Sequence, residues 1–262
     1  MTAPSAQFRA EYARHRAAEG RGLSGDALHA LPYLRSGPLA RQWQVRARSF
    51  EAFVGHVLQP RHKARGRRVL DLGAGNGWLC HRIAKMGFDV TAVDIRDDAV
   101  DGLGAARALL RGNPGLFACI AASFDRLPFQ DRHFDITVFN ASLHYAFDLA
   151  SVLREAERVT SRGGVIAILD SPFYRRDAAG QAMVREKLAH GAEQFGERAG
   201  VLLGHGFIEY LTRERLAAAA PELKWRRHRV LYPLWYELRP LAAWLRGKRP
   251  PSRFDLWVAA VP

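Results

Sequence analysis

The chain has 262 residues, of which 48% are hydrophobic and 25% charged, and its formal net charge is +13. This composition supports a large folded core and excludes global disorder, and no apolar stretch reaches the length that crosses a membrane. The two cysteines, Cys80 and Cys119, are too few for a disulfide framework or a thiolate metal cluster, so we expect no metal and a reducing, cytoplasmic setting.

The first 65 residues predict a helical cap that precedes the main domain. They carry no chemical motif, and the opening run MTAPSAQFRAEYARHR lacks the apolar core of a signal peptide. This part holds 11 Lys or Arg against 4 Asp or Glu, and the stretch RQWQVRARSF (41–50) interleaves aromatic and basic residues. Such a stretch can stack on bases or contact a lipid interface.

Residues 66–262 predict one α/β domain. Strand-like runs alternate with helix-like runs, which is typical of a parallel sheet with helices on both faces. Continuous apolar runs such as VIAIL fit strands that are buried on both sides. The predicted strands are 67–73, 88–95, 116–123, 134–141 and 164–171, and the predicted helices are 77–86, 97–111 and 149–161, the last stopped by the glycines of SRGG.

The pattern changes after residue 171. We expect a helical insertion over about 174–208 and a helix over 211–221 that Thr212 caps. The runs ELKWRRHRVLY and SRFDLWVAAVP predict two strands that pair antiparallel at the end of the sheet. A second insertion, over about 231–251, lies between these two strands.

The residues that indicate a ligand lie in VLDLGAGNGWLC (69–80), where a predicted strand passes through a glycine turn into a predicted helix. A dinucleotide-binding turn would have its third glycine where Trp78 stands, and a phosphate-binding P-loop needs a Lys that is absent here. The second predicted strand delivers Asp94, which is placed to accept hydrogen bonds from ribose hydroxyls. The turn and Asp94 together predict a ligand that carries an adenosine.

Over residues 66–171 the chain resembles the class I S-adenosylmethionine-dependent methyltransferases, especially the type 11 branch that is similar to enzymes of ubiquinone and menaquinone biosynthesis. The run AASFDRLPFQDRHFDITVFNASLHY resembles two further motifs of this family. The resemblance implies that S-adenosylmethionine is the cofactor, that Asp94 binds its ribose and that Ile95 packs on its adenine. It also implies that Asp71 lies near the ammonium group, and that the methionine part is wrapped by Gly73, Ala74, Gly75 and Gly77.

One position departs from the family pattern. An acid that meets the adenine amino group usually stands where this chain has Ser123. The resemblance then implies that Ser123, Asp125 or the backbone makes this contact, with Phe124 in the same cofactor-binding stretch. Asn140 is expected to touch the cofactor through its backbone.

Acceptor chemistry is expected from NASLHY (140–145), at the carboxyl end of the fourth strand. His144 is a candidate general base, because its usual pKa lies near the operating pH, and the alternative is a histidine that only packs near the cofactor. Tyr145 is a second candidate, with a pocket wall as its more favoured role. DSPF (170–173) resembles a motif of DNA amino-methyltransferases, but it follows the fifth strand, so we interpret it as a turn that lines the pocket.

We therefore expect a Rossmann-like, seven-stranded, mostly parallel sheet with an antiparallel last strand, helices on both faces and an N-terminal helical cap. The expected function is methyl transfer to an O, C or N atom of a hydrophobic or anionic small molecule that is quinone-, lipid- or secondary-metabolite-like. The alternatives are an RNA methyltransferase, which the charge suggests but no RNA-binding motif supports, and a partner protein that binds S-adenosylmethionine without turnover.

The insertion 231–251 has two interpretations. Its apolar residues recur at helical spacing, and residues 221–262 hold 9 Lys or Arg against 3 Asp or Glu. The helix can cover the sheet with its apolar face while its basic residues face water. Alternatively, it forms a lid over the acceptor pocket and a peripheral contact with anionic lipid. The apolar positions are Leu231, Leu234, Trp235, Leu238, Leu241 and Leu245.

Overall fold

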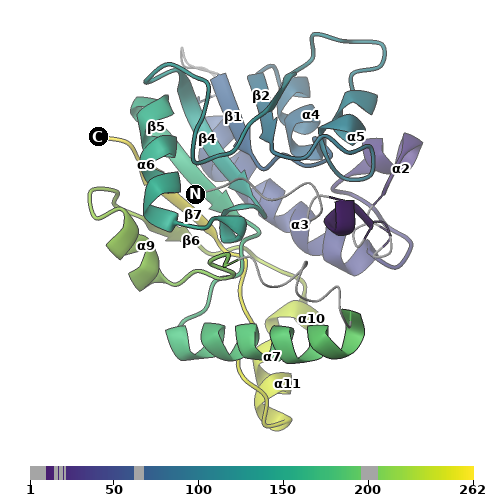
Figure 1. Cartoon of the computed structure of the whole chain (residues 1–262), viewed down its shortest axis with the longest axis vertical. Coiled ribbons are helices and arrows are strands. Elements are labelled where there is room, and N and C mark those ends of the chain that lie inside the picture. Colours follow the sequence, from purple (N-terminus) through teal and green to yellow (C-terminus); the bar gives the residue numbers. More distant parts are fainter. Residues whose placement is uncertain (1–9, 15–16, 18–19, 21, 62–67, 196–205) are drawn as a thin grey trace.

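The computed structural model describes residues 10–14, 17, 20, 22–61, 68–195 and 206–262, and Figure 1 shows their arrangement. A seven-stranded sheet with the strand order β3-β2-β1-β4-β5-β7-β6 runs through the centre. Neighbouring strands from β3 to β5 are parallel, whereas β7 is antiparallel to both β5 and β6. The strands are β1 (Arg68–Leu72), β2 (Asp89–Asp94), β3 (Ala118–Ala121), β4 (Phe134–Asn140), β5 (Thr160–Leu169), β6 (Arg226–His228) and β7 (Leu256–Ala260).

Helices cover both faces of this sheet (Figure 1), and a hydrophobic core lies on each face. Successive strand residues point to opposite faces, so Val69 belongs to the first core and Leu70 to the second. The first core is closed by α3 (Ala40–Phe53), α4 (Trp78–Lys85) and α5 (Leu103–Ala108), and the second by α6 (Leu149–Val159) and α9 (Arg213–Ala219). The expected sheet, with its antiparallel end and its two helical layers, is confirmed.

Side-chain oxygens that accept hydrogen bonds from backbone N–H groups set the start of two helices. The predicted helix over 97–111 shortens to α5, because the Asp98 carboxylate accepts from the N–H groups of Val100 and Asp101 at 3.0 and 2.9 Å. Such local bonds favour a turn over a helix. At α9 the Thr212 hydroxyl accepts from the Arg215 N–H at 3.1 Å, which is the cap that the sequence predicts.

The glycines of SRGG do not stop a helix, as the sequence suggested, but lie inside a strand. α6 ends at Val159 and β5 begins directly after it, earlier than the predicted start at residue 164. Gly163 has a φ of 73°, and its N–H donates to the Val261 carbonyl at 2.9 Å. Glycine allows this irregularity in the ladder, because the left-handed φ costs it little.

Further helices lie before and after the sheet strands. α2 (Gly25–Ala30) precedes α3, which continues into a π-helical turn (Val54–Leu58) and a 3₁₀ turn (Gln59–Arg61). α7 (Asp177–Phe195) occupies the first expected insertion, whose residues 196–205 lie outside the described residues. No helix in the described part of the chain is both long and apolar enough to cross a membrane.

The second insertion contains two short helices, α10 (Leu234–Glu237) and α11 (Arg239–Leu245), in place of one. Pro240 explains the break, because a proline fits in the first turn of a helix but not inside one. The apolar side chains do not cover the sheet: Trp244 is 74% exposed, and Figure 1 shows α11 projecting from the lower end of the molecule. We name the exposed set the apolar tip: Leu231, Leu234, Trp235, Leu238, Leu241, Trp244 and Leu245.

Candidate cofactor and acceptor site

The glycine turn after β1 fits closely against the loop that follows β4. Gly73 has a φ of 77°, and a Cβ added there would lie 2.3 Å from the Ser142 Cβ. The N–H groups of Gly73 and Ala74 both donate to the Val93 carbonyl, at 2.8 and 3.0 Å. Only glycine permits both this φ and this approach. The turn therefore presents bare backbone at the carboxyl ends of the strands.

Substituting Gly73 by Ala is expected to lower the melting temperature and to remove cofactor binding, because the new methyl group would push the turn away from Ser142. Thermal unfolding and calorimetry with S-adenosylhomocysteine measure the two effects. Gly37→Ala is the matched control: Gly37 has a φ of 89° and nothing within 4 Å of an added Cβ. If both variants lose the same stability, backbone strain alone explains the effect and the close contact is irrelevant.

Asp94 joins the end of β2 to the glycine turn. Its two carboxylate oxygens accept hydrogen bonds from the N–H groups of Gly75 and Arg96, each at 2.8 Å. Burial raises the pKa of this carboxyl, and Arg96 and the two N–H donors offset part of the rise. Each oxygen retains a further lone pair, so Asp94 can still accept from a ligand hydroxyl.

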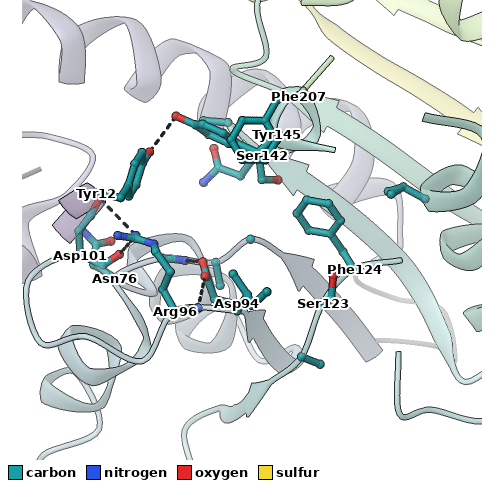
Figure 2. Close-up of a pocket in the computed structure, with 18 of the residues that line it drawn as sticks. Tyr12, Asn76, Asp94, Arg96, Asp101, Ser123, Phe124, Ser142, Tyr145 and Phe207 are labelled. Atoms are coloured by element: carbon teal, nitrogen blue, oxygen red, sulfur yellow. Dashed lines mark hydrogen bonds and ion pairs between the residues drawn. The ribbon is translucent and has the colours of Figure 1, made fainter. Parts of the chain in front are cut away.

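A cavity opens between this turn and the carboxyl ends of β2, β3 and β4 (Figure 2). This is the edge at which open parallel sheets bind their ligands. The predicted residues that line it are Gly73, Ala74, Gly75, Asp94, Ile95, Ser123, Phe124, Asn140 and Tyr145, and Asp125 lines it as well. Three predicted residues do not line this cavity: Asp71, Gly77 and His144.

Asp71 lies beneath the cavity and not in its wall. Its side chain is fully buried, and the Cys80 Sγ donates to one carboxylate oxygen at 3.2 Å. Burial raises the pKa of the Asp71 carboxyl to about 7. A contact between Asp71 and a ligand ammonium group would therefore be indirect, through the turn that it supports. Cys80 is itself a buried core residue.

Gly77 has a packing role. Its φ is 72°, it precedes α4, and a Cβ added there would lie 2.7 Å from the Ala106 Cβ of α5. The glycine lets the two helices approach each other behind the cavity. The third glycine of the turn is thus required by helix packing, and the first two face the cavity.

Several lining residues come from segments in which sequence analysis found no motif. The Tyr12 hydroxyl donates to the Tyr145 hydroxyl at 2.8 Å, and Figure 2 shows this bond between two residues that line the cavity. The Arg96 guanidinium lies 4.9 Å from the centre of the Tyr12 ring, a cation–π distance. Trp43 and Arg46 come from α3, within the aromatic and basic run 41–50, and this run was the only signal for them.

A second cavity of about 510 Å³ adjoins the first. The two share three lining residues, Arg46, Ala141 and Tyr145. His144 lines this second cavity, with its ring centre 4.3 Å from that of Tyr145. The other lining residues are Gln42, Val45, Asp170, Pro172, Trp235, Tyr236, Arg239 and Phe254. DSPF thus lines a pocket, as the sequence predicts, and the base of the second insertion borders the same space.

Comparison with known proteins identifies the central part of the chain. The profile of the family described as "Methyltransferase domain" matches residues 70–168. Over these residues the chain is similar to that family. The expected resemblance is confirmed over this part of the chain. Two solved structures of similar fold hold S-adenosylmethionine or S-adenosyl-L-homocysteine.

The curated relatives match about two fifths of the chain. Malonyl-[acyl-carrier protein] O-methyltransferase of Erwinia billingiae is 32% identical over 104 residues, which cover 40% of this chain and 39% of the relative. Ubiquinone/menaquinone biosynthesis C-methyltransferase UbiE of a Shewanella species is 33% identical over 109 residues, covering 40% of this chain and 43% of the relative. The chain thus spans about two fifths of the length of the curated relatives that it matches.

Solved structures confirm the fold beyond this domain. Geranyl diphosphate C-methyltransferase of Streptomyces coelicolor, in complex with Mg²⁺, geranyl diphosphate and S-adenosyl-L-homocysteine, superposes with a TM-score of 0.57. The superposition covers 100% of both chains at 14% identity, so it shows that the folds are similar and nothing about function. In the described part of the present chain, no group of three His, Cys, Asp or Glu side chains is arranged to hold a metal ion.

The residues that line the first cavity fit S-adenosylmethionine. Gly73, Ala74 and Gly75 line it, where the methionine part of the cofactor is expected. Asp94 presents carboxylate lone pairs to the cavity, and both Ser123 and Asp125 line it where the adenine contact is expected. A family acid is absent at position 123, but an acid two residues further on reaches the same cavity.

Proposed function

We propose that this protein transfers a methyl group from S-adenosylmethionine, bound in the first cavity, to a small molecule in the second. The adjoining cavities, with Arg46, Ala141 and Tyr145 in the wall of both, are the observation that supports this proposal. Bound cofactor supplies a methyl group on a sulfonium that is already activated. What the chain must add is an acceptor atom held in line at about 3–3.5 Å, and a shared wall suits that task.

The second cavity indicates the class of acceptor. Trp235, Tyr236 and Phe254 give it an aromatic wall, whereas Arg46 and Arg239 bring positive charge. A cavity of about 510 Å³ with apolar walls and a few polar groups is typical of a small-molecule site. The named relatives act on a malonyl-acyl-carrier protein, on ubiquinone and menaquinone precursors and on geranyl diphosphate. We infer an acceptor with an apolar body and a polar or anionic group.

The experiment is release of S-adenosylhomocysteine on incubation with S-adenosylmethionine and a whole-cell extract of the source cells. We expect methyl label in an organic-soluble product, unaffected by ribonuclease. Loss of the product after ribonuclease treatment would favour the RNA alternative. Tight binding of S-adenosylhomocysteine without any labelled product from whole-cell extract would favour the partner that binds cofactor without turnover.

We also propose that the apolar tip touches an anionic membrane surface. Seven large apolar side chains are exposed on it, and Arg246 and Lys248 are exposed beside them. Helices that lie at a membrane interface combine such an apolar face with basic and aromatic residues. Arg249 takes no part in this, because it binds Glu186 at 2.7 Å and Tyr174 at 3.0 Å and so fastens the end of the insertion to α7.

Co-sedimentation with vesicles is the measurement for the tip. Anionic vesicles should bind the protein at low salt, and the double variant Arg246→Gln, Lys248→Gln should weaken binding by about 2 kcal/mol, at about 1 kcal/mol per basic residue. Arg35→Gln, Lys85→Gln is the matched control, since it removes the same charge from exposed positions elsewhere. Equal effects of both double variants, or no binding at low salt, would contradict the membrane contact.

A further inference from the structure

Asp170 is a buried carboxylate whose oxygens accept no hydrogen bond from the residues that the structure describes. It directly follows β5 and lines the second cavity, and its side chain is only 4% exposed. Neither carboxylate oxygen receives a hydrogen bond from a described residue, and the nearest charged group, the Arg46 Nε, lies 3.7 Å away. A buried carboxylate without hydrogen bonds destabilises a fold, so a group of this kind indicates a function.

The neighbouring hydroxyl groups are already engaged elsewhere. Tyr232 donates its single proton to the Phe254 carbonyl at 2.8 Å. Ser49, at 2.9 Å from the Tyr232 oxygen, must then be the donor in that pair, and its own proton is used. Neither hydroxyl therefore has a proton left for a hydrogen bond to Asp170, although the Ser49 side chain lies near enough to lower the pKa of this carboxyl.

The backbone at Asp170 is also unusual. Its φ is 54°, a left-handed conformation that few residues other than glycine adopt, although Asp and Asn tolerate it best. This conformation holds the residue at the wall of the cavity. An Asn at this position would keep the backbone preference and the shape while removing the charge.

We propose that Asp170 is the specificity residue of the acceptor site: it accepts a hydrogen bond from a hydroxyl or amino group of the acceptor. The proposal rests on the proposed function, in which the second cavity holds the methyl acceptor. It narrows the acceptor class to molecules that carry a hydrogen-bond donor on an apolar, flat body, because aromatic side chains line the rest of the wall. Removal of a proton from the methylated atom is a separate task, for which His144 is the candidate.

The direct test is calorimetry of two matched probes, para-propylphenol and para-propylanisole, with the full chain saturated with S-adenosylhomocysteine. The phenol can donate to a carboxylate and the anisole cannot. We expect the wild type to prefer the phenol by about tenfold or more, as for a hydrogen bond to a charged group, and Asp170→Asn to lose most of that preference. Asp97→Asn, which alters an exposed carboxylate paired with Arg107, is the control and should keep it.

Stability gives a second measurement that needs neither cofactor nor acceptor. Burial raises the pKa of the Asp170 carboxyl, while Arg46 and Ser49 offset part of the rise. The charged form is thus disfavoured in the folded state, and the wild type loses stability as the pH rises from the ordinary Asp pKa through the raised one. The other titratable and charged groups that face this region are His144 and Tyr145 after β4, and Tyr232, Tyr236, Arg239 and Asp255 from the C-terminal part.

We expect Asp170→Asn to melt close to the wild type at about pH 4 and to melt higher by about 2–4 °C at neutral pH. A variant that melts lower than the wild type at every pH would show that the carboxylate is structural and would overturn the proposal. So would an equal preference of wild type and variant for the phenol. Failure of S-adenosylhomocysteine to bind the wild type would count against the proposed function instead, and the melting curves would still decide the role of Asp170.

Discussion

Replacing His144 by Ala should lower turnover by about 10²–10⁴, which is the range for loss of a general base. His144 lines the second cavity and not the first, in which the cofactor is proposed to bind, so the affinity for S-adenosylhomocysteine should be unchanged. The proposed reason is that its imidazole takes the proton of an acceptor hydroxyl as that oxygen bonds to the methyl carbon. Steady-state rates with the labelled product, together with calorimetry, measure both halves of the expectation.

The control for His144 is His190→Ala, a histidine on α7 whose side chain is 76% exposed. It should leave both quantities at the wild-type level. A loss below about threefold in His144→Ala would assign the residue to packing, because that lies outside the range for a general base. Its ring packs beside Tyr145, and its carbonyl accepts from the Glu209 N–H at 2.9 Å, so a packing role has a structural basis of its own.

Asp94→Ala is expected to weaken binding of S-adenosylhomocysteine by at least about 1.5–3 kcal/mol, the cost of losing a charged hydrogen-bond acceptor. The structure adds a second contribution, because the Gly75 and Arg96 N–H groups would lose their acceptor and the turn would loosen. Asp94→Asn retains one acceptor oxygen and should have an intermediate effect. Calorimetry for the three proteins, with thermal unfolding alongside, separates lost contacts from lost fold.

Asp89→Ala is the matched control, since this residue is exposed at the other end of the same strand. An unchanged affinity in Asp94→Ala would remove the assignment of Asp94 to the ribose. Tighter binding of NADH than of S-adenosylmethionine by the wild type would overturn the cofactor itself.

The sheet and the cofactor edge were predictable because their signals are local. Buried strands give continuous apolar runs, and a backbone that must lie bare against a ligand gives glycines, so the turn at 73–77 and Asp94 could be placed from the sequence. Helix ends were less predictable. The Asp98 side chain accepts from backbone N–H groups and so delays the start of a helix. Gly163 allows an irregular turn inside a strand, whereas glycine after a helical run usually marks the end of the helix.

The second cavity was only partly predictable, because it is assembled from distant segments. The sequence placed the turn DSPF at a pocket, but Arg46 from α3, Asp170 after β5 and Trp235 from the second insertion meet only in the folded chain. The sequence also does not tell which of two acids at strand ends is buried. Asp71 and Asp94 are both acids at strand ends, yet Asp71 lies under the turn and Asp94 faces the cavity.

Because the two cavities have a wall in common, we expect binding in one to change the affinity of the other for its ligand. Arg46 and Tyr145 border both spaces, so a ligand that fixes these side chains on one side alters what the other side offers. Such a coupling is reciprocal: the factor by which bound S-adenosylhomocysteine changes the affinity for a phenol must equal the factor by which the phenol changes the affinity for S-adenosylhomocysteine. Two titrations in opposite order would therefore measure the same quantity, the coupling free energy between the two ligands.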